Sequence, residues 1–297
     1  HSSAMLLLPP LQAGLCLLLL AQAEVLKHTF KNTPCSQFFF KGQEARVGMP
    51  NQAARICQRY NNRYHFATLY DRQKRIPVYS AYLYRPKAGV CKRPDWFIEP
   101  QLAENKKSLK DMQNEKQTSI DKKKLKESQA VSDDYKTNSN IYDRGHLNPS
   151  LHHDDGDSKT ATFTLTNIVP QFNQLNQGTW NNYETQTMRD KSQGCKVTYA
   201  LVGAVPGNQK VGNDRVTVPS HIWAAACCQL KKNKLRSWAA IATNDENETK
   251  VTTVVQGHAK PQTQDLQVQR CPSCTLTGFT AKEMLSEVVK KDENNSI

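Results

Sequence analysis

The residues of this chain that could perform chemistry lie between positions 143 and 184. The tetrapeptide Asp143-Arg144-Gly145-His146 provides an imidazole, and Asn176 and Glu184 follow with side-chain oxygens. A neutral imidazole can take a proton from water, while amide and carboxylate oxygens suit a hard divalent cation. Phosphodiester hydrolysis needs both functions, because negative charge develops on the phosphate and on the departing oxygen. The segment therefore predicts a metal-assisted hydrolytic site.

The elements around these residues must bring them to one place. Residues 140–146 predict a strand, and residues 161–169, dense in Thr, Phe, Leu and Ile, predict a strand that returns antiparallel to it. Residues 173–189 carry apolar side chains at helical spacing and predict a helix. We expect this order to place His146 and Asn176 at one basic cleft, with their side chains within about 10 Å of each other.

The polar stretch 151–159 between these strands is expected to form a loop. It contains the run His152-His153-Asp154-Asp155-Gly156-Asp157, whose composition would suit a metal ion. Turn chemistry in a polar loop explains the same residues, and we expect them to be solvated.

The sequence resembles a known family at these positions. Residues 142–147, with the stretch that holds Asn176 and Glu184, are similar to the DNA/RNA non-specific endonucleases, whose fold contains a ββα-metal (His-Me) finger. Upstream segments resemble the endonuclease domain-containing 1 subgroup. The similar segments are 199–207 and 218–223 for the family, and 35–40, 56–59, 66–70 and 75–81 for the subgroup.

The resemblance implies that His146 is the general base of the reaction. Its ring must be held in one tautomer, and we expect one nitrogen to donate to a backbone carbonyl near Phe163. Arg144 and Arg93 are the candidate cations for phosphate charge, because a guanidinium suits two phosphate oxygens. Arg93 resembles the family's transition-state arginine, with Arg85 or Lys92 as alternatives.

Three further residues are implied at the substrate side of the site. Asn167 and Gln171 resemble cleft residues of the family, and each is expected to hydrogen-bond either the strand backbone or the substrate. Asp143 is expected to brace the motif by accepting hydrogen bonds, since a carboxylate beside a basic cleft stays ionised and is a poor base.

The expected metal ion is Mg²⁺, with Mn²⁺ as a substitute. Asn176 is a neutral oxygen donor, which suits an ion that keeps several waters; the alternative is that it caps a helix. Glu184 comes eight residues later in the sequence, or roughly 12 Å along a helix axis, which is too far for both side chains to reach one ion. We therefore expect Glu184 to act through a metal-bound water.

Composition favours one large domain with polyanionic partners. The chain has 297 residues with 38% apolar content, enough for a full core, and a formal charge of +13. A basic surface suits DNA and RNA but would equally suit heparin or a membrane surface. The net charge therefore indicates a polyanionic partner but does not indicate which activity the protein has.

The beginning of the sequence predicts secretion. Residues 5–23 contain an apolar run over 11–20 and a small-residue cleavage pattern ending at Ala23, which predicts a signal peptide that leaves a domain over 24–297. An uncleaved anchor is the alternative, although the apolar run is short for a bilayer. We expect no stable membrane insertion, and the oligomeric state is not predicted.

The cysteines agree with an oxidising compartment. Of nine, Cys16 lies in the signal sequence, which leaves an even eight for disulfides. The pair Cys271 and Cys274 could instead form half of a zinc site or a redox pair, but no partner motif accompanies it. The sequons at Asn247 and Asn294 agree with secretion.

The remaining chain predicts an α+β fold with a central antiparallel sheet flanked by helices. Strands are expected at 60–70, 75–84, 196–205, 215–218, 237–243 and 250–255, and a final helix after Thr280. A lysine-rich insertion at about 104–127 has few large apolar residues. We expect it to be a solvated segment that is mobile or partly helical, with a nucleic-acid-binding arm as the alternative.

These observations predict a secreted, metal-dependent endonuclease that cleaves DNA and RNA with little sequence preference. The alternative is a non-catalytic secreted protein that binds nucleic acid or another polyanion with the same fold. A degenerate member should have lost the base or the ligand, whereas His146, Asn176 and Glu184 are all present.

Overall fold

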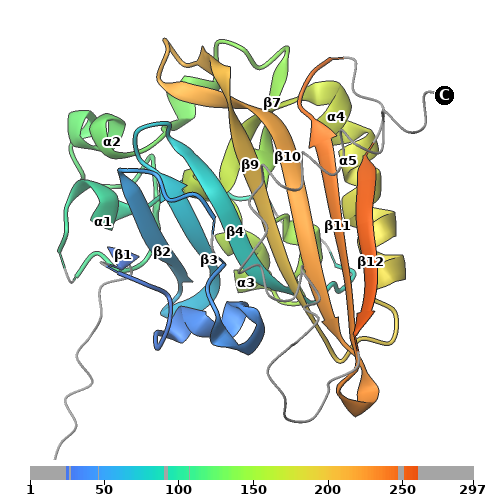
Figure 1. The fold of residues 1–297 in the computed structure, drawn as a ribbon. Helices are drawn as coiled ribbons and strands as arrows, with labels where there is room; N and C mark the ends of the chain where they lie inside the picture. Colours follow the sequence, from blue (N-terminus) through green and yellow to red (C-terminus); the bar gives the residue numbers. More distant parts are fainter. Residues whose placement is uncertain are drawn as a thin grey trace, which may run out of the picture.

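The structure is a computed structural model that describes residues 25–26, 28–45, 47–89, 93–106, 108–246 and 251–259. Its largest feature is an eight-stranded antiparallel sheet in the order β1-β2-β3-β4-β9-β10-β11-β12 (Figure 1). The strands are β1 (Val25–Leu26), β2 (Ala53–Tyr60), β3 (Arg63–Asp71), β4 (Ile76–Tyr84), β9 (Val197–Val211), β10 (Val216–Gln229), β11 (Leu235–Thr243) and β12 (Thr252–Ala259). Each strand of this sheet pairs with the strand that follows it closely in the sequence, except that β4 pairs with β9. Between these two strands, 112 residues separate Tyr84 from Val197.

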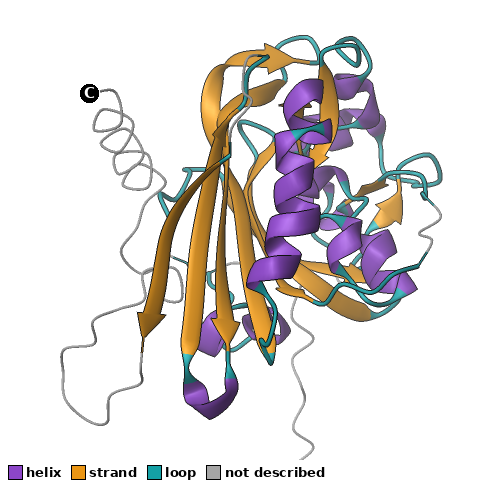
Figure 2. Ribbon diagram, turned by 90° about the vertical axis from the view of Figure 1, so that its right-hand side faces the viewer, coloured by secondary structure: helices purple, strands orange, loops and turns teal. Residues whose placement is uncertain are grey.

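That intervening chain forms the layer of helices and short strands on one face of the sheet (Figure 2). It contains β5 (Phe97–Ile98), α1 (Pro100–Ala103), β6 (Gln113–Asn114), α2 (Lys122–Ser128), β7 (Tyr142–His146), α3 (Gly156–Ala161), β8 (Ile168–Phe172), α4 (Asn173–Gln177), α5 (Thr179–Asn182) and α6 (Met188–Lys191). Strands β7 and β8 form an antiparallel pair separate from the main sheet. The predicted order of strand, strand and helix is confirmed.

The sheet has two differently covered faces, because side chains alternate along each strand. Along β9, Ala200 and Val202 pack against the helical layer, whereas Leu201 between them packs against the opposite cover. The opposite cover is the segment 28–45, which contributes Phe30 and Phe39 to a buried apolar cluster.

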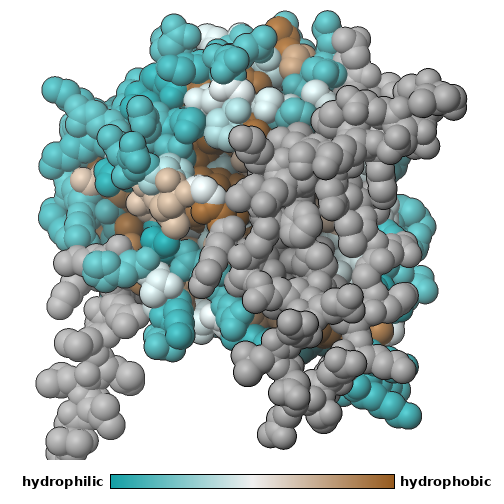
Figure 3. Space-filling view, in the orientation of Figure 1, coloured by the Kyte–Doolittle hydropathy of each residue, from teal (hydrophilic) through white to brown (hydrophobic). Residues whose placement is uncertain are grey.

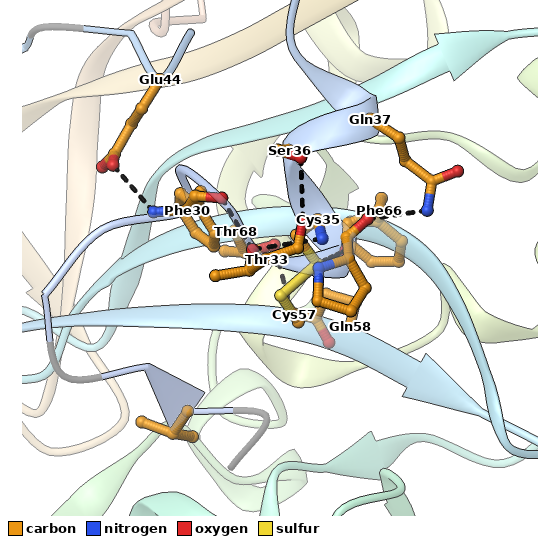
Figure 4. Close-up of a disulfide and its surroundings, with 12 residues drawn as sticks. Phe30, Thr33, Cys35, Ser36, Gln37, Glu44, Cys57, Gln58, Phe66 and Thr68 are labelled. Carbon is orange, nitrogen blue, oxygen red and sulfur yellow. Dashed lines mark hydrogen bonds between the residues drawn. A yellow bond between two sulfur atoms is a disulfide. The ribbon is translucent and has the colours of Figure 1, made fainter. Parts of the chain in front are cut away.

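The disulfide Cys35–Cys57 ties that segment to β2 (Figure 4). A short 3₁₀ helix, Pro34–Phe38, begins with Thr33, whose side chain accepts from the Cys35 backbone N–H. Nearby, Glu44 accepts from the Phe30 backbone N–H at 3.0 Å. A second disulfide, Cys195–Cys228, joins the chain after α6 to β10. Disulfides were predicted from the even cysteine count, and these two confirm them.

The lysine-rich segment differs from the prediction. Apart from Lys107, residues 104–127 are described and contain β6 and most of α2, and Met112, Ile120 and Leu125 are buried in the main core. Asp121 caps α2 by accepting from two backbone N–H groups. Six lysines of the segment are exposed: Lys106, Lys116, Lys122, Lys123, Lys124 and Lys126. The side of the molecule that carries α1 and α2 is largely hydrophilic (Figure 3). The expectation of a mobile segment is therefore wrong, because three spaced apolar side chains anchor it, whereas the expectation of a partly helical segment agrees with α2.

Several predicted boundaries also shift. The second strand of the hairpin is β8, which begins at Ile168, and residues 151–159 contribute to a helix, α3, rather than forming only a loop. None of the helices in the described ranges is long and apolar enough to cross a membrane. The predicted signal peptide and final helix lie outside the described residues.

Candidate active site

The hairpin β7–β8 holds the tetrapeptide in a fixed register. Gly145 pairs with Val169, and His146 pairs with Ile168. A Cβ atom on Gly145 would lie 2.2 Å from Oε1 of Gln171, so the glycine makes room for that side chain. The glycine therefore permits close packing between β7 and the Gln171 side chain.

His146 lies between two aromatic rings at the end of β7. Its ring centroid is 5.5 Å from that of Trp96 and 5.1 Å from that of Phe163. Burial, with a smaller contribution from the Arg93 charge, lowers the His146 pKa to about 4. The imidazole is therefore neutral at pH 7.

The expected hydrogen bond from His146 to a carbonyl near Phe163 is not formed. Nε2 of His146 is buried and has no hydrogen-bond partner among the described residues. The contact with Phe163 is edge-to-face between the rings, at an interplanar angle of 79°. Aromatic packing, which a sequence pattern does not reveal, holds this ring.

Arg144 is packed as tightly as the imidazole beside it. Its guanidinium lies 5.2 Å from the ring of Trp96 and 5.8 Å from that of Tyr135, and it donates to the Ser132 carbonyl at 3.2 Å. Its Nε atom is buried without a partner among the described residues. Burial lowers the Arg144 pKa from its usual range.

Arg93 is exposed and acts on both groups through its charge. It lowers the pKa of His146 and contributes in the same direction to the pKa of Arg144. The positive charge of Arg93 therefore acts on both side chains. Lys92 lies outside the described residues, and Arg85 lies at the end of β4, where its backbone N–H bonds the His152 carbonyl.

Asp143 connects the hairpin to the following helix. Its Oδ2 accepts from Nδ2 of Asn176 and from Nε2 of Gln177, both at 2.8 Å. The Asn176 amide is thus held through its nitrogen. Its oxygen has no partner among the described side chains and is available to bind a cation. Asp143 therefore braces Asn176, and no contact in the described structure assigns it to a substrate.

The helix that carries Asn176 is interrupted twice before Glu184. Gly178 ends α4 with a non-helical backbone, and a Cβ there would lie 2.5 Å from the Gln174 carbonyl oxygen. Residues Tyr183–Thr187 then form a π-helical turn. Burial raises the pKa of Glu184 to about 8, with Trp180 acting in the opposite direction. A cation beside this carboxyl group would favour its ionised form.

Asn167 and Gln171 occupy interior positions. Asn167 is fully buried, and its amide makes four hydrogen bonds, to Ser80, the backbone of Asn148 at both N–H and carbonyl, and Thr162. Gln171 is 1% exposed and packs against Gly145. Of the two expected partners, Asn167 therefore bonds the protein backbone, and both polar atoms of its amide are already bonded within the protein. Burial of Gln171 likewise disfavours direct substrate binding.

His152 and His153 are also buried, at 1% and 5% exposed. His152 bonds the Tyr82 hydroxyl through Nδ1 and the Glu184 carbonyl through Nε2, both at 2.9 Å. His153 bonds Oδ1 of Asn148 at 2.7 Å. The prediction that both are solvated turn residues is wrong. The apolar and aromatic neighbours that bury them come from β4, which is distant in sequence.

Among the described residues, no group of three or more His, Cys, Asp or Glu side chains is placed to hold a metal. The oxygen donors that the sequence predicted for an ion are the Asn176 amide, whose oxygen makes no hydrogen bond with another described residue, and the Glu184 carboxyl group. Two protein donors of this kind would suit an ion such as Mg²⁺ that keeps most of its water.

The architecture and the site define a class, the ββα nucleases: an imidazole on a two-stranded hairpin is followed by a helix with an amide and a carboxyl group. The same fold occurs in the crystal structure of the EndoG/EndoGI complex. That match has a TM-score of 0.51 and 19% identity, and it covers 72% of this chain and 81% of the other.

The chain belongs to the DNA/RNA non-specific endonuclease family, which its residues 45–273 match. It is 35% identical over 201 residues to the human Endonuclease domain-containing 1 protein and 34% identical over 202 residues to the mouse one. These matches cover 66% of this chain and 39% of each relative. A protein described as a nuclease from Nostoc is 37% identical over 83 residues, 28% of this chain and 30% of its own length.

Proposed function

We propose that this chain is a metal-dependent endonuclease that hydrolyses phosphodiester bonds in DNA and RNA. The observation that carries the proposal is a pair of groups on β7. His146 is neutral, and its buried Nε2 has no partner among the described residues. Asp143 accepts from the nitrogen of the Asn176 amide, which leaves the amide oxygen available to a cation. Family membership supports nuclease activity in general.

His146 would take the proton from the attacking water. A base with a pKa of about 4 is weak, because burial and the Arg93 charge both oppose its protonation. A phosphodiester bound at Arg93 would offset that positive charge and raise the imidazole pKa toward the working pH. Substrate binding would thus strengthen the base only where it is needed.

Arg144 and Arg93 would bind the phosphate oxygens. Arg144 has a buried donor without a partner among the described residues, and the rings of Trp96 and Tyr135 keep its guanidinium desolvated. A desolvated cation gains more from an anion than a hydrated one does. Arg93, being exposed, can reach a phosphate as it enters.

Asn176 would bind the ion directly, and Glu184 would hold one of its waters. A bound Mg²⁺ or Mn²⁺ supplies a positive charge that stabilises the phosphate and the departing oxygen. The protein groups in this arrangement address the phosphate and not the bases, so little sequence preference is expected.

The basic surface and the disulfides support two related proposals. A charge of +13 favours nucleic-acid substrates, and disulfides are typical of an extracellular protein. We propose that the chain is secreted after cleavage near Ala23. Expression in cultured animal cells, with detection in the medium and terminal sequencing, tests this proposal.

The direct test is incubation of the purified protein with supercoiled plasmid and with single-stranded RNA. We expect cleavage of both with Mg²⁺ or Mn²⁺ and none with excess chelator. A His28→Ala variant, changed at an exposed histidine, is the matched control for variants of His146. Binding without cleavage under all metal conditions would reject the enzyme and favour a nucleic-acid-binding protein.

A further inference from the structure

We infer that His152 is a positioning residue for Glu184: it connects the π-helical turn that carries this glutamate to the central sheet. The inference rests on the proposed function, because it concerns a group of the same site. His152 is not within the tetrapeptide or the helix, and its role follows from contacts in the fold.

The first observation is a carbonyl group released by the π-helical turn. In an α-helix the Glu184 carbonyl would accept from the Met188 backbone N–H, four residues later. Here that N–H donates to the Tyr183 carbonyl, five residues back. The Glu184 carbonyl instead accepts from Nε2 of His152 at 2.9 Å. His152 thus replaces the donor that the altered helix withdraws.

The tautomer of His152 follows from its two partners. A carbonyl can only accept, so Nε2 must carry the proton, and Nδ1 must then accept from the Tyr82 hydroxyl. One oriented chain of hydrogen bonds therefore runs from Tyr82 through His152 to Glu184.

The second observation is that the main sheet holds His152 itself. The Arg85 backbone N–H donates to the His152 carbonyl at 2.8 Å, and the ring lies 4.7 Å from the ring of Tyr84. Tyr82 and Tyr84 belong to β4, which pairs with β9 in the centre of the sheet. The backbone at Glu184 is therefore held in place by the main sheet, through His152, as well as by its own helix.

π-helical turns are often found at functional sites, because they shift the residues that follow by part of a turn. Glu184 must reach a water on an ion held by Asn176, across the break at Gly178. The hydrogen bond from His152 to the Glu184 carbonyl fixes the position of the backbone from which the Glu184 side chain extends. Without it, the turn can revert toward α-helical pairing and move the carboxyl group away from the ion.

A matched set of variants separates this role from simple packing. His152→Gln keeps a donor near Nε2 and loses the acceptor for Tyr82. His152→Asn keeps a polar group near Nδ1 but is too short to reach the Glu184 carbonyl. Tyr82→Phe removes only the hydroxyl, and His153→Gln changes a neighbouring buried histidine that bonds Asn148 instead.

Three measurements are made on each variant that retains a cooperative thermal transition. They are the Mg²⁺ concentration for half-maximal cleavage, Mn²⁺ binding followed by electron paramagnetic resonance without nucleic acid, and hydrogen exchange of the peptide 183–191. We expect His152→Asn to raise the Mg²⁺ requirement about tenfold and to speed exchange in that peptide. His152→Gln should recover most of the loss, and Tyr82→Phe should cost about twofold.

Equal effects of His152→Gln and His152→Asn would overturn the proposal, as would an unchanged Mg²⁺ requirement in His152→Asn. A shift of the same size in His153→Gln would show a general packing effect and would also overturn it. If the parent protein cleaves nothing, the proposed function fails, whereas hydrogen exchange and Mn²⁺ binding still test whether His152 holds the turn.

Discussion

The two faces of the main sheet are built on different principles. The face covered by residues 28–45 is closed by aromatic and aliphatic side chains and by the disulfide Cys35–Cys57. The face covered by the ββα layer buries Gln171 and half-buries His146 and Arg144, each with a buried polar atom that lacks a partner among the described residues. The first face holds one such atom within its apolar cluster, the Tyr79 hydroxyl, whereas the second gathers them around the candidate site, where a substrate or water can bond them.

The largest expected effect is on the ββα face. His146→Ala should lower cleavage of plasmid DNA by roughly 10²- to 10⁴-fold, because the proposed general base is removed. Binding, measured by fluorescence anisotropy with Ca²⁺ in place of Mg²⁺, should change little. In the parent, kcat/KM should fall only as the pH drops toward about 4, since it reports the free enzyme, whose base is neutral above that value. Wild-type rates in the variant would remove His146 from the mechanism.

The next effect should appear on the other face and leave the chemistry alone. Replacing Cys35 and Cys57 together by Ala removes a link that spans 22 residues. This should cost about 3 kcal/mol of unfolding free energy, measured in urea, because the unfolded chain gains conformational freedom. The rate constant of the folded fraction should stay near the parent value. A loss of turnover at full folding would show that the two faces are coupled.

Asn176 and Glu184 should differ in kind. Asn176→Ala removes the proposed direct ligand and should both slow cleavage and raise the Mg²⁺ requirement. Glu184→Ala acts through a water and should cost roughly 10- to 100-fold in metal affinity or activity. Metal-dependence curves on one DNA substrate distinguish the two. A much larger shift in metal affinity for Glu184→Ala would exchange their roles.

The two buried histidines of the ββα face should make it sensitive to acid. Burial lowers the pKa of His152 to about 4 and of His153 to about 3, below the ordinary value of 6.5. Between pH 6.5 and about 4 these histidines bind protons in the unfolded chain but not in the folded protein. The free energy of unfolding is therefore greatest above pH 6.5 and falls as the pH drops. The slope is about 1.4 kcal/mol per pH unit for each histidine.

Urea titrations at several pH values check this slope, and His153→Gln should reduce it. The control is His28→Ala, which changes an exposed histidine and should leave the slope unaltered. An identical slope in the parent and in His153→Gln would show that His153 does not contribute.

The smallest effect concerns the exposed lysines of α2. Changing Lys122, Lys123 and Lys126 to Gln should leave saturated turnover intact and reduce the slope of log affinity against log salt, by roughly 0.7 to 0.9 for each phosphate that the variant no longer neutralises. These side chains are exposed, whereas Leu125 on the same helix is buried. Point changes are therefore a cleaner test than deletion of the segment. A loss of saturated turnover would place α2 in the active site.

The sequence predicted local features well where one motif defines them. The tetrapeptide, Asn176 and the succession of two strands and a helix lie close together in the chain, and their order alone indicated the ββα unit. The strands that contain Tyr79 and Leu201, β4 and β9, were predicted from their composition. The π-helical turn was not predicted, because helical spacing does not reveal which donor each carbonyl receives.

Contacts between distant segments could not be predicted. Trp96 lies fifty residues before His146, yet its ring contacts both the imidazole and Arg144. His152 is adjacent to polar turn residues, yet Tyr82 and Tyr84 bury it. Asn167 resembled a substrate-binding residue because an amide looks the same in a cleft and in a core. Burial depends on what the rest of the chain places around a residue.

The position of the catalytic layer within the chain limits how such a protein can lose its activity. Tyr84 at the end of β4 pairs with Thr198 at the start of β9, so the whole layer between them is an excursion that returns to its starting point. Excising it would leave a continuous sheet but would strip one entire face of its apolar cover. Deletion of the whole layer is therefore expected to unfold the protein, whereas point substitutions at the candidate site can remove activity and leave the layer intact. Two such proteins, one active and one not, would have superimposable backbones, so that outline alone would not tell a nuclease from its silent copy.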